Sequence, residues 1–563
     1  MPSRIYRSSY PPIESVDIDL LTFLFSNPNN TPDDKRIYID AVTEDARTYG
    51  EVKQRTRSLA HGLRGLGVKP RDVVAFISPN SIDYPITCFA VLACGGTISP
   101  LSAAYTPTEI QAQLETSGAK CLIAHSSLMD NAEKAVQFDP TIKIVQADGN
   151  CDRHGKPTAE YLATNCPSSP VVSIKSSEAS ERLSFMCFSS GTTGRAKGVM
   201  TTHHNLVSNM KQWILQMPEV TAGHDTFVTF LPFSHIYGLA LYVCNGTLVG
   251  STTVVMPRFE PELYLSCIQK YRPESAALVP PIMLLLAKHP IVEKYDLSSL
   301  KRVYSGAAPL SAELREAVEA RFKKLYGTTV LGLQAWGLTE TSPLAAATPP
   351  SRPDKRYTVG NITPNMEFRV VDPETIQDTG TEADGSAKPG ELWCRGPNVM
   401  KGYYRNEEAT KDGFAADEDG GKPWFRTGDI GSIDKDGFII LLDRIKEMIK
   451  YKGLQVIPSE LEGKLLENPD VEDACVVGRW VEEQAAELPV GFVVVTAKAR
   501  GKGDKAIAEE INIWLNGRVA NHKKLRGGVY VVDAIPKSPS GKILRRQLKA
   551  TLKATSTRVA AKL

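Results

Sequence analysis

The 563-residue sequence has little net charge, and its first residues form no apolar segment. Its 66 lysine and arginine residues nearly balance 64 aspartate and glutamate residues, so charge gives no indication of nucleic acid or an anionic membrane as a required partner. Residues 1–7 lack the apolar run of a secretory signal. The most apolar stretch, residues 239–256, is interrupted by glycine and small polar residues, which favours a buried helix and strand over a membrane span.

The sequence also lacks cysteines at informative spacings. Its ten cysteines are scattered without C-x-x-C pairs or the spacing of zinc ligands. The pattern therefore indicates neither a disulfide framework nor a zinc centre, and it is typical of a protein in a reducing compartment.

The composition and the order of apolar segments predict a fold class. With 42% apolar and 23% charged residues the chain is globular, and its length calls for more than one core. Short apolar runs lie at residues 73–77, 121–124, 142–145, 227–231, 252–256, 276–279 and 330–333. Amphipathic segments such as residues 49–66 and 312–326 lie between them, which predicts an α/β fold with mainly parallel, helix-covered sheets.

Two changes in composition divide the chain. Past residue 360, turn residues separate short alternating segments at 367–371, 390–395 and 433–442, which predicts a small β-rich subdomain. A compact region of helices and strands follows residue 443. We therefore expect an N-terminal domain of residues 1–442 and a small α+β C-terminal domain of residues 443–563.

The two predicted domains carry opposite net charge. Residues 443–563 contain 22 basic and 15 acidic residues, whereas residues 1–442 contain 44 and 49. Facing lobes of opposite charge suit a polyphosphate site between them, although a solvated basic face explains the charges equally well.

A glycine- and hydroxyl-rich segment follows the apolar run at residues 183–188. Its candidate phosphate-binding residues are Ser189, Ser190, Gly191, Thr192, Thr193, Gly194 and Lys197. The glycines allow close backbone approach to an anion, the hydroxyls donate to phosphate oxygens, and the lysine adds a positive charge. The segment is not a Walker A loop, because Lys197 stands three residues after Gly194. A flexible hairpin is the alternative that this segment alone leaves open.

Residues 334–340, Gln-Ala-Trp-Gly-Leu-Thr-Glu, form a second candidate site. Trp336 offers a face for adenine, Thr339 a donor for the α-phosphate, and Glu340 a hard oxygen ligand for Mg²⁺. Taken alone, the same residues also suit a structural turn followed by a helix cap.

These segments, in this order, resemble the adenylate-forming superfamily across nearly the whole chain. That superfamily contains acyl-CoA synthetases, 4-coumarate:CoA ligases, beetle luciferases and peptide-synthetase adenylation domains. The sequence departs from the common pattern at Ala196, where many members carry proline, and at Trp336, where tyrosine is commoner. The resemblance implies an ATP- and Mg²⁺-dependent ligase that first forms an acyl-adenylate and then transfers the acyl group to coenzyme A.

The resemblance also assigns roles to individual residues. Phosphate-loop residues, Gln334, Ala335 and Trp336 would bind the nucleotide, and Asp429 and Arg444 would contact the ribose. Lys542, in a C-terminal loop, would be the adenylation lysine, acting with Thr339 and Glu340. Lys446 would be the hinge of a mobile C-terminal lobe, whose rotation would bring Lys452 and Gly453 to the CoA thiol and Gln455 to AMP. The neighbouring Lys537, Arg545, Arg546 and Lys549 are expected to form a solvated basic helix start.

The segment at residues 231–239 closely resembles that of 4-coumarate:CoA ligases. By this resemblance His235 would line the passage shared by the carboxylate and the thiol, and Tyr237, Leu241, Ala307 and Leu344 would shape the acyl pocket. Taken alone, His235 would more often be a core histidine. The segment predicts an apolar pocket for an aryl or medium-to-long acyl carboxylic acid.

The last three residues, Ala561, Lys562 and Leu563, resemble the S-K-L class of peroxisomal address. They would bind a peroxisomal import receptor, and a cytoplasmic protein with a chance match is the alternative.

The motifs leave three other functions open. A carrier-loading adenylation enzyme or a luciferase-like oxygenase would share the adenylation site. A non-catalytic nucleotide-binding protein fits less well, because Lys197, Glu340, Asp429, Arg444 and Lys542 are all present.

Overall fold

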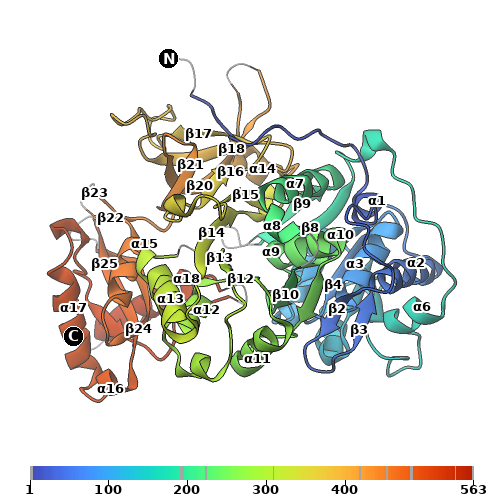
Figure 1. Cartoon of the computed structure of the whole chain (residues 1–563), viewed down its shortest axis with the longest axis horizontal. Helices are drawn as coiled ribbons and strands as arrows, with labels where there is room; N and C mark the ends of the chain where they lie inside the picture. Colours follow the sequence, from blue (N-terminus) through green and yellow to red (C-terminus); the bar gives the residue numbers. More distant parts are fainter. Residues whose placement is uncertain are drawn as a thin grey trace.

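The chain forms a large N-terminal lobe, a β-rich subdomain and a smaller C-terminal lobe (Figure 1). The computed structural model describes residues 4–560, except 190–195, 222–224, 308–309, 418–419, 452–453, 482–485 and 539–540. In Figure 1 the N-terminal lobe lies at the right and centre, the subdomain above it, and the C-terminal lobe, in red, at the left. The predicted α/β fold with a smaller C-terminal lobe is confirmed.

The first N-terminal sheet has six strands in the order β7-β6-β4-β5-β8-β9. They are β4 Val73–Ile77, β5 Thr97–Leu101, β6 Cys121–Ala124, β7 Lys143–Gln146, β8 Leu183–Ser189 and β9 Lys197–Thr202. Neighbouring strands run parallel except β8 and β9, which form an antiparallel hairpin. Every residue of β4 is buried, as expected for a parallel strand covered on both faces.

Helices cover these strands, and several of them begin at a capped residue. The longest N-terminal helix, α2 Tyr49–Gly65, starts with a capping box between Thr48 and Glu51 and packs against α3 Tyr84–Ala93. The other N-terminal and subdomain helices are α1 Leu20–Leu24, α4 Pro107–Ser117, α5 Met129–Ala135, α6 Ala159–Asn165, α7 His203–Gln216, α8 Pro218–Thr221, α9 Ile236–Gly238, α11 Pro261–Tyr271, α12 Pro280–Lys288, α13 Ala312–Tyr326 and α14 Glu407–Gly413.

A second sheet has the order β10-β11-β2-β3, with β2 Arg36–Asp40, β3 Ala46–Thr48, β10 Thr226–Thr229 and β11 Thr252–Val255. The apolar stretch that leads into β11 is the predicted helix and strand. It consists of a π-helix, Leu239–Asn245, then α10 Gly246–Val249, then β11. In the described part of the chain, no helix is long and apolar enough to cross a membrane.

A continuous sheet connects the N-terminal lobe to the subdomain. Its parallel part is β12 Ser275–Leu278, β13 Arg302–Ser305 and β14 Leu331–Gly337. Its antiparallel part continues through β15 Leu344–Ala347, β16 Gly360–Ile362, β21 Phe438–Arg444, β20 Trp424–Ile433, β18 Gly390–Arg395, β17 Glu367–Val371 and β1 Tyr6–Arg7, and β19 Phe414–Ala415 pairs with β20. Strand β14 is therefore the strand at which parallel pairing gives way to antiparallel pairing.

The prediction of one strand over residues 433–442 is wrong. Strand β20 ends at Ile433 and β21 begins at Phe438, with a turn between them. The Asp434 carboxylate accepts the backbone N–H groups of Asp436 and Phe438, and Gly437 has a φ of 85°. These are the features of an aspartate-initiated turn, which reverses the chain.

The C-terminal lobe has its own sheets and apolar cores. Its strands are β22 Ile449–Tyr451, β23 Leu454–Val456, β24 Val471–Val481, β25 Ala486–Val495 and β26 Val529–Val531, and its helices are α15 Pro458–Leu466, α16 Ala497–Arg500, α17 Asp504–Asn516 and α18 Arg545–Ala560. Its two apolar clusters draw their buried members from residues 449–552. The predicted boundary between residues 442 and 443 falls inside β21, two residues before this strand ends.

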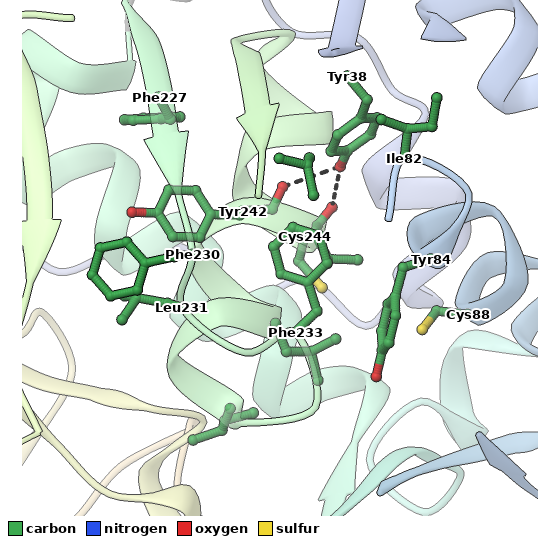
Figure 2. Packing of buried hydrophobic residues seen from close by; sticks show 14 of the residues in the cluster. Tyr38, Ile82, Tyr84, Cys88, Phe227, Phe230, Leu231, Phe233, Tyr242 and Cys244 are labelled. Atoms are coloured by element: carbon green, nitrogen blue, oxygen red, sulfur yellow. Dashed lines mark hydrogen bonds between the residues drawn. The ribbon is translucent and has the colours of Figure 1, made fainter. Parts of the chain in front are cut away.

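An aromatic core supports the helical segment that follows residue 235 (Figure 2). Tyr38 on β2 is 1% exposed, and its hydroxyl lies 2.7 Å from the Thr247 hydroxyl and within 3.2 Å of two carbonyl oxygens, those of Tyr242 and Val243. Phe233 and Tyr84 pack edge to face in the same core. Contacts from distant parts of the chain therefore hold the π-helix in place.

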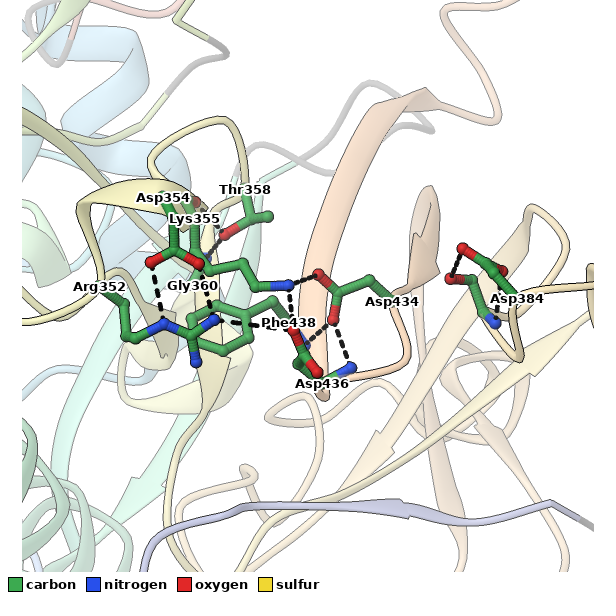
Figure 3. A network of polar contacts seen from close by, with 10 residues as sticks. Arg352, Asp354, Lys355, Thr358, Gly360, Asp384, Asp434, Asp436 and Phe438 are labelled. Carbon is green, nitrogen blue, oxygen red and sulfur yellow. Dashed lines mark hydrogen bonds and ion pairs between the residues drawn. The ribbon is translucent and has the colours of Figure 1, made fainter.

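A buried ion-pair network holds the turn at residues 434–437 to the loop at residues 352–358 (Figure 3). The Lys355 amine lies 2.8 Å from Asp434 and 2.5 Å from Asp436. Burial lowers the pKa of Lys355, but the hydrogen bonds to Asp434 and Asp436 raise it overall. The loop that this network holds also carries the Thr358 carbonyl, which accepts from the Gln334 amide at 3.3 Å.

We expect Lys355→Met to lower the stability of this part of the protein by about 2–3 kcal/mol, because the change leaves the buried Asp434 carboxylate without its cation. Thermal unfolding measures the effect as a lower Tm. Lys301→Met is the matched control, since it removes a lysine whose pair with Glu274 is exposed and contributes little. Equal Tm values for the two variants would contradict the expectation.

Candidate active site

The predicted phosphate loop lies at the open end of the β8–β9 hairpin. Ser189 and Lys197 face each other as the last paired residues of these two strands. The Lys197 amine lies over the ring of Tyr403, 4.7 Å from its centre. The predicted loop residues Ser190, Gly191, Thr192, Thr193 and Gly194 lie outside the described residues.

Glu340 lies beside the same tyrosine. The short helix at Thr339–Thr341 follows β14 directly, and Glu340 within it is 8% exposed. The Tyr403 hydroxyl donates to a carboxylate oxygen of Glu340 at 3.0 Å, and burial followed by the Glu340 charge raises the pKa of that hydroxyl. Tyr403 thus links the predicted phosphate lysine to the predicted metal ligand, a contact that no local sequence pattern indicates.

The donor set at this place fits a magnesium ion held together with a nucleotide. The described residues contain no cluster of three or more histidine, cysteine or acidic side chains that would hold a metal by themselves. Mg²⁺ is often held by one or two carboxylates together with substrate phosphates and water, and Glu340 supplies one hard oxygen ligand of that kind. A site with the single carboxylate of Glu340 therefore suits a Mg²⁺ ion that is also bound to the phosphates of the nucleotide.

Asp429 connects three strands of the central sheet. It faces Arg444 in the β20–β21 ladder, and the Arg444 Nε lies 3.0 Å from one carboxylate oxygen. The other oxygen accepts the indole N–H of Trp336 on β14 at 2.9 Å. The Asp429 charge, opposed by desolvation, raises the pKa of the Arg444 guanidinium.

Trp336 holds Asp429 in place, a role that the sequence did not predict. Its side chain is largely buried, and its ring packs against Phe368 with ring centres 5.8 Å apart. Stacking of this ring on adenine stays a prediction. The structure adds a positioning contact to Asp429 that a tyrosine, with a hydroxyl in place of the indole N–H, would not make in the same geometry.

Lys542 is brought to this carboxylate from the C-terminal lobe. A Cβ on Gly541 would lie 3.0 Å from Val279, the residue that follows β12, so the Lys542 loop contacts the N-terminal lobe closely. Burial and the nearby Arg444 charge lower the pKa of Lys542, against the effect of Glu447 and Asp429. Burial and the Lys542 charge lower the pKa of His235 to about 4, so this imidazole is neutral at pH 7.

The expectation of a solvated Arg545 is wrong. Its guanidinium lies 2.7 Å from Glu447 and 2.8 Å from Glu462, and its side chain is only 14% exposed. Arg545 opens α18 three residues after Lys542, and Glu447 directly follows the predicted hinge Lys446. This paired arginine therefore ties the lysine loop to the hinge region.

The structure does not describe the side chains of the remaining predicted C-terminal site residues. Lys452 and Gly453 lie outside the described residues, as do Ala561, Lys562 and Leu563. Gln455 is on β23, but its side chain is not described.

An apolar cavity lies next to the end of β14. Its volume is about 80 Å³, and most of the residues that line it are apolar. The predicted Tyr237, Leu241 and Leu344 line it, and so does Ala335. His235 and Ala307 are not among the lining residues, and Ala307 is exposed with a φ of 67°. His235 instead caps the helix, because its Nδ1 accepts the backbone N–H of Tyr237 at 3.2 Å.

The sequence did not predict most of the residues that line the cavity. The further lining residues are Asn209, Trp213, Met217, Val220, Phe227, Ala240, Asn245, Ser275, Ala276, Ala277, Tyr304 and Pro343. They come from α7 and α8 with Met217 between them, from β10, from the helical segment after residue 235, and from β12 and β13, and Pro343 directly precedes β15. Only the alignment of these elements in space brings them to one cavity.

Comparison with known families gives this site its context. A family model described as AMP-binding enzyme matches residues 24–404, and the model of its C-terminal domain matches residues 460–542. The chain belongs to the AMP-binding enzyme family. It is an AMP-forming acid–thiol ligase that uses ATP and coenzyme A.

Named relatives of this AMP-binding enzyme span nearly its whole length. It is 37% identical to 4-coumarate–CoA ligase 1 of Petroselinum crispum, with 97% of each chain covered. It is 35% identical to peroxisomal OPC-8:0-CoA ligase 1 of Arabidopsis thaliana, with 96% of this chain and 94% of the relative covered. Among solved structures it is similar to ATP-bound MatB from Rhodopseudomonas palustris, with a TM-score of 0.80, 26% identity, and coverage of 95% and 99% of the two chains.

We expect Trp336→Phe in this AMP-binding enzyme to raise the KM for ATP by about tenfold, with a smaller change in the KM for the acid. The variant keeps an aromatic ring but loses a hydrogen bond to a carboxylate, a bond that contributes about 1.5–3 kcal/mol. Steady-state kinetics with each substrate varied in turn measures both constants.

Trp424→Phe is the matched control for this experiment. It removes another indole N–H that donates to a carboxylate, that of Asp417 at 3.2 Å, outside the candidate site. A KM for ATP that stays at the wild-type value in Trp336→Phe would contradict a positioning role.

Proposed function

We propose that the enzyme forms the adenylate of an aryl or medium-to-long acyl carboxylic acid in the space between Lys542 and the end of β14. The observation that carries this proposal is the convergence of Lys542, Asp429 and Arg444. Strand β14 carries both Trp336, which donates to Asp429, and Ala335, which lines the apolar cavity. Asp429 accepts the ribose hydroxyls, and the phosphate loop with Lys197 and Thr339 holds the phosphates.

The adenylation step is an in-line attack of the carboxylate on the α-phosphorus, which expels pyrophosphate. Lys542 places an ammonium between two anions that repel each other and stabilises the charge that develops at the α-phosphate. Mg²⁺ held at Glu340 would neutralise further phosphate charge. Neutral His235 beside Lys542 adds no charge that would compete for the carboxylate.

The second step needs a different arrangement of the C-terminal lobe. Rotation about Lys446 withdraws Lys542 and presents Lys452 and Gly453 to the CoA thiol and Gln455 to AMP, after which the thiol attacks the activated carbonyl and AMP leaves. The salt bridges of Arg545 keep the lysine loop and the start of this lobe together, so that both move as one body.

Two other reactions of the acyl-adenylate are compatible with the same adenylation step. A carrier protein could take the acyl group in place of coenzyme A, and oxygen could react with the adenylate in a luciferase-like reaction. The named relatives are CoA ligases, which favours coenzyme A as the acceptor.

The C-terminal tripeptide and one relative support a peroxisomal location. Ala561, Lys562 and Leu563 would be recognised by an import receptor, and the Arabidopsis relative is named as peroxisomal.

We expect Lys542→Ala to reduce adenylate formation by at least a hundredfold while sparing CoA transfer from a supplied acyl-adenylate. The reason is that the lysine stabilises only the first transition state. Pyrophosphate release with ATP and acid measures the first step, and AMP release from the adenylate with and without CoA measures the second.

Lys537→Ala is the control within the same loop, since its amine pairs with Asp473 at 2.5 Å and lies outside the site. If Lys542→Ala abolished both half-reactions, the division of roles would be contradicted. AMP release that does not depend on CoA would contradict CoA as acceptor.

We also expect a fluorescent protein fused to the N-terminus to enter peroxisomes only while residues 561–563 are present. Microscopy of the full chain and of the chain without these residues measures the effect. Equal localisation of the two proteins would refute the address, and a diffuse signal from both would favour the cytoplasmic alternative.

A further inference from the structure

Tyr403 contacts two side chains of opposite charge with two different parts of its own side chain. The Lys197 amine lies over the ring, 4.7 Å from its centre, whereas the Glu340 carboxylate accepts a hydrogen bond from the hydroxyl at 3.0 Å. A ring face attracts a cation and a phenolic O–H donates to an anion, so each charge meets the part of the tyrosine that suits it. Tyr403 and Glu340 are 9% and 8% exposed, so water screens these contacts only weakly.

The two charged groups form no ion pair with each other. Glu340 has no ion-pair partner among the described residues, and neither has Lys197. The Glu340 charge helps to raise the pKa of Arg444, but the ion pair of this arginine is with Asp429. A glutamate is almost never buried without a paired cation, so this arrangement needs a reason.

Backbone hydrogen bonds place Tyr403 beside both segments that carry these charges. Residues 400–404 lie along strand β9, which begins at Lys197, and share with it three backbone hydrogen bonds of 2.8–3.0 Å. The Met400 N–H donates to the Glu340 carbonyl at 2.8 Å. None of these bonds involves the Tyr403 side chain, so a substitution at this position removes the ring while the two charged residues stay close to it.

Without the ring, a direct ion pair would compete with ligand binding. Attraction between an ammonium and a carboxylate is strong in a site that excludes water, and it exceeds the attraction between an ammonium and a ring. Such a pair would occupy the carboxylate that a metal ion needs and the ammonium that a phosphate needs. The phenol is neutral, and its single O–H uses only one of about four lone-pair positions of the carboxylate.

We propose that Tyr403 is a positioning residue that keeps Lys197 and Glu340 apart, so that the ammonium remains available to the nucleotide phosphates and the carboxylate to the Mg²⁺ that binds with them. This inference goes beyond the proposed function and rests on the roles that it gives to Lys197 and Glu340. It predicts that the ring, more than the hydroxyl, determines how strongly Mg²⁺ promotes the binding of ATP.

Equilibrium dialysis of ATP in the absence of an acid measures this effect separately from catalysis. The Kd for ATP in EDTA divided by the Kd in Mg²⁺ gives the enhancement ratio. We expect Tyr403→Leu to lower this ratio by at least about fivefold, because leucine is too short to separate the two charges. Tyr403→Phe keeps the ring and should retain the ratio to within about twofold.

A second background distinguishes this role from a structural one. In Lys197→Met no ammonium can pair with Glu340, so adding Tyr403→Leu should change the enhancement ratio by less than about twofold. A structural effect of the lost ring would lower the ratio equally in both backgrounds, and this result would overturn the separating role. Tyr404→Leu is the matched control and should keep the wild-type ratio, since this neighbouring ring contacts the Arg405 guanidinium and packs in a different apolar cluster.

The other outcomes separate the inference from the proposed function. A Tm for each variant shows that it is folded, and Tyr403→Met, with a flexible side chain that fills irregular space, is the second variant without a ring. An unchanged ratio in both variants without the ring, or an equal loss in Tyr403→Phe, would overturn the separating role and leave the proposed function standing. A wild-type affinity for ATP that does not depend on Mg²⁺, or a wild-type ratio in Glu340→Gln, would overturn the metal role of Glu340 and the inference with it.

Discussion

The carboxylate of Asp429 is the contact on which the arrangement of the site depends. It is buried, and it is held from two sides by the indole N–H of Trp336 and the guanidinium of Arg444. A buried carboxylate is stable only when its charge is paired and hydrogen-bonded, so these partners fix its position. Because the three residues lie on β14, β20 and β21, the same contact aligns the parallel half of the sheet with the antiparallel half.

The C-terminal lobe completes the site through a small number of contacts. Gly541 lets the Lys542 loop approach Val279 closely, and Arg545 ties that loop to Glu447 beside the hinge. The lysine is thereby placed where burial and Arg444 lower its pKa. A lobe attached in this way can carry its lysine into the site or out of it without rebuilding its own core, since its apolar clusters are formed within residues 449–552.

The helical segment that follows His235 contributes both to the proposed reaction site and to the lining of the acyl cavity. Its N-terminal end carries His235, whose pKa the Lys542 charge lowers, and Tyr237, and its π-helical part carries Leu241 and Asn245. Hydrogen bonds from Tyr38 to the backbone of this segment give it a fixed position.

The sequence by itself determined the fold class, the limits of buried strands such as β4 and the order of the nucleotide-binding segments, because local periodicity, turn residues and motif spacing are properties of short stretches of chain. It misjudged residues 433–442 and Arg545, where a turn and two distant carboxylates decide the outcome. Only the tertiary structure decided that Tyr403 joins Lys197 to Glu340, that Trp336 holds Asp429, and which residues line the cavity. These contacts join residues that are tens to hundreds of positions apart, and no local pattern encodes which of them meet.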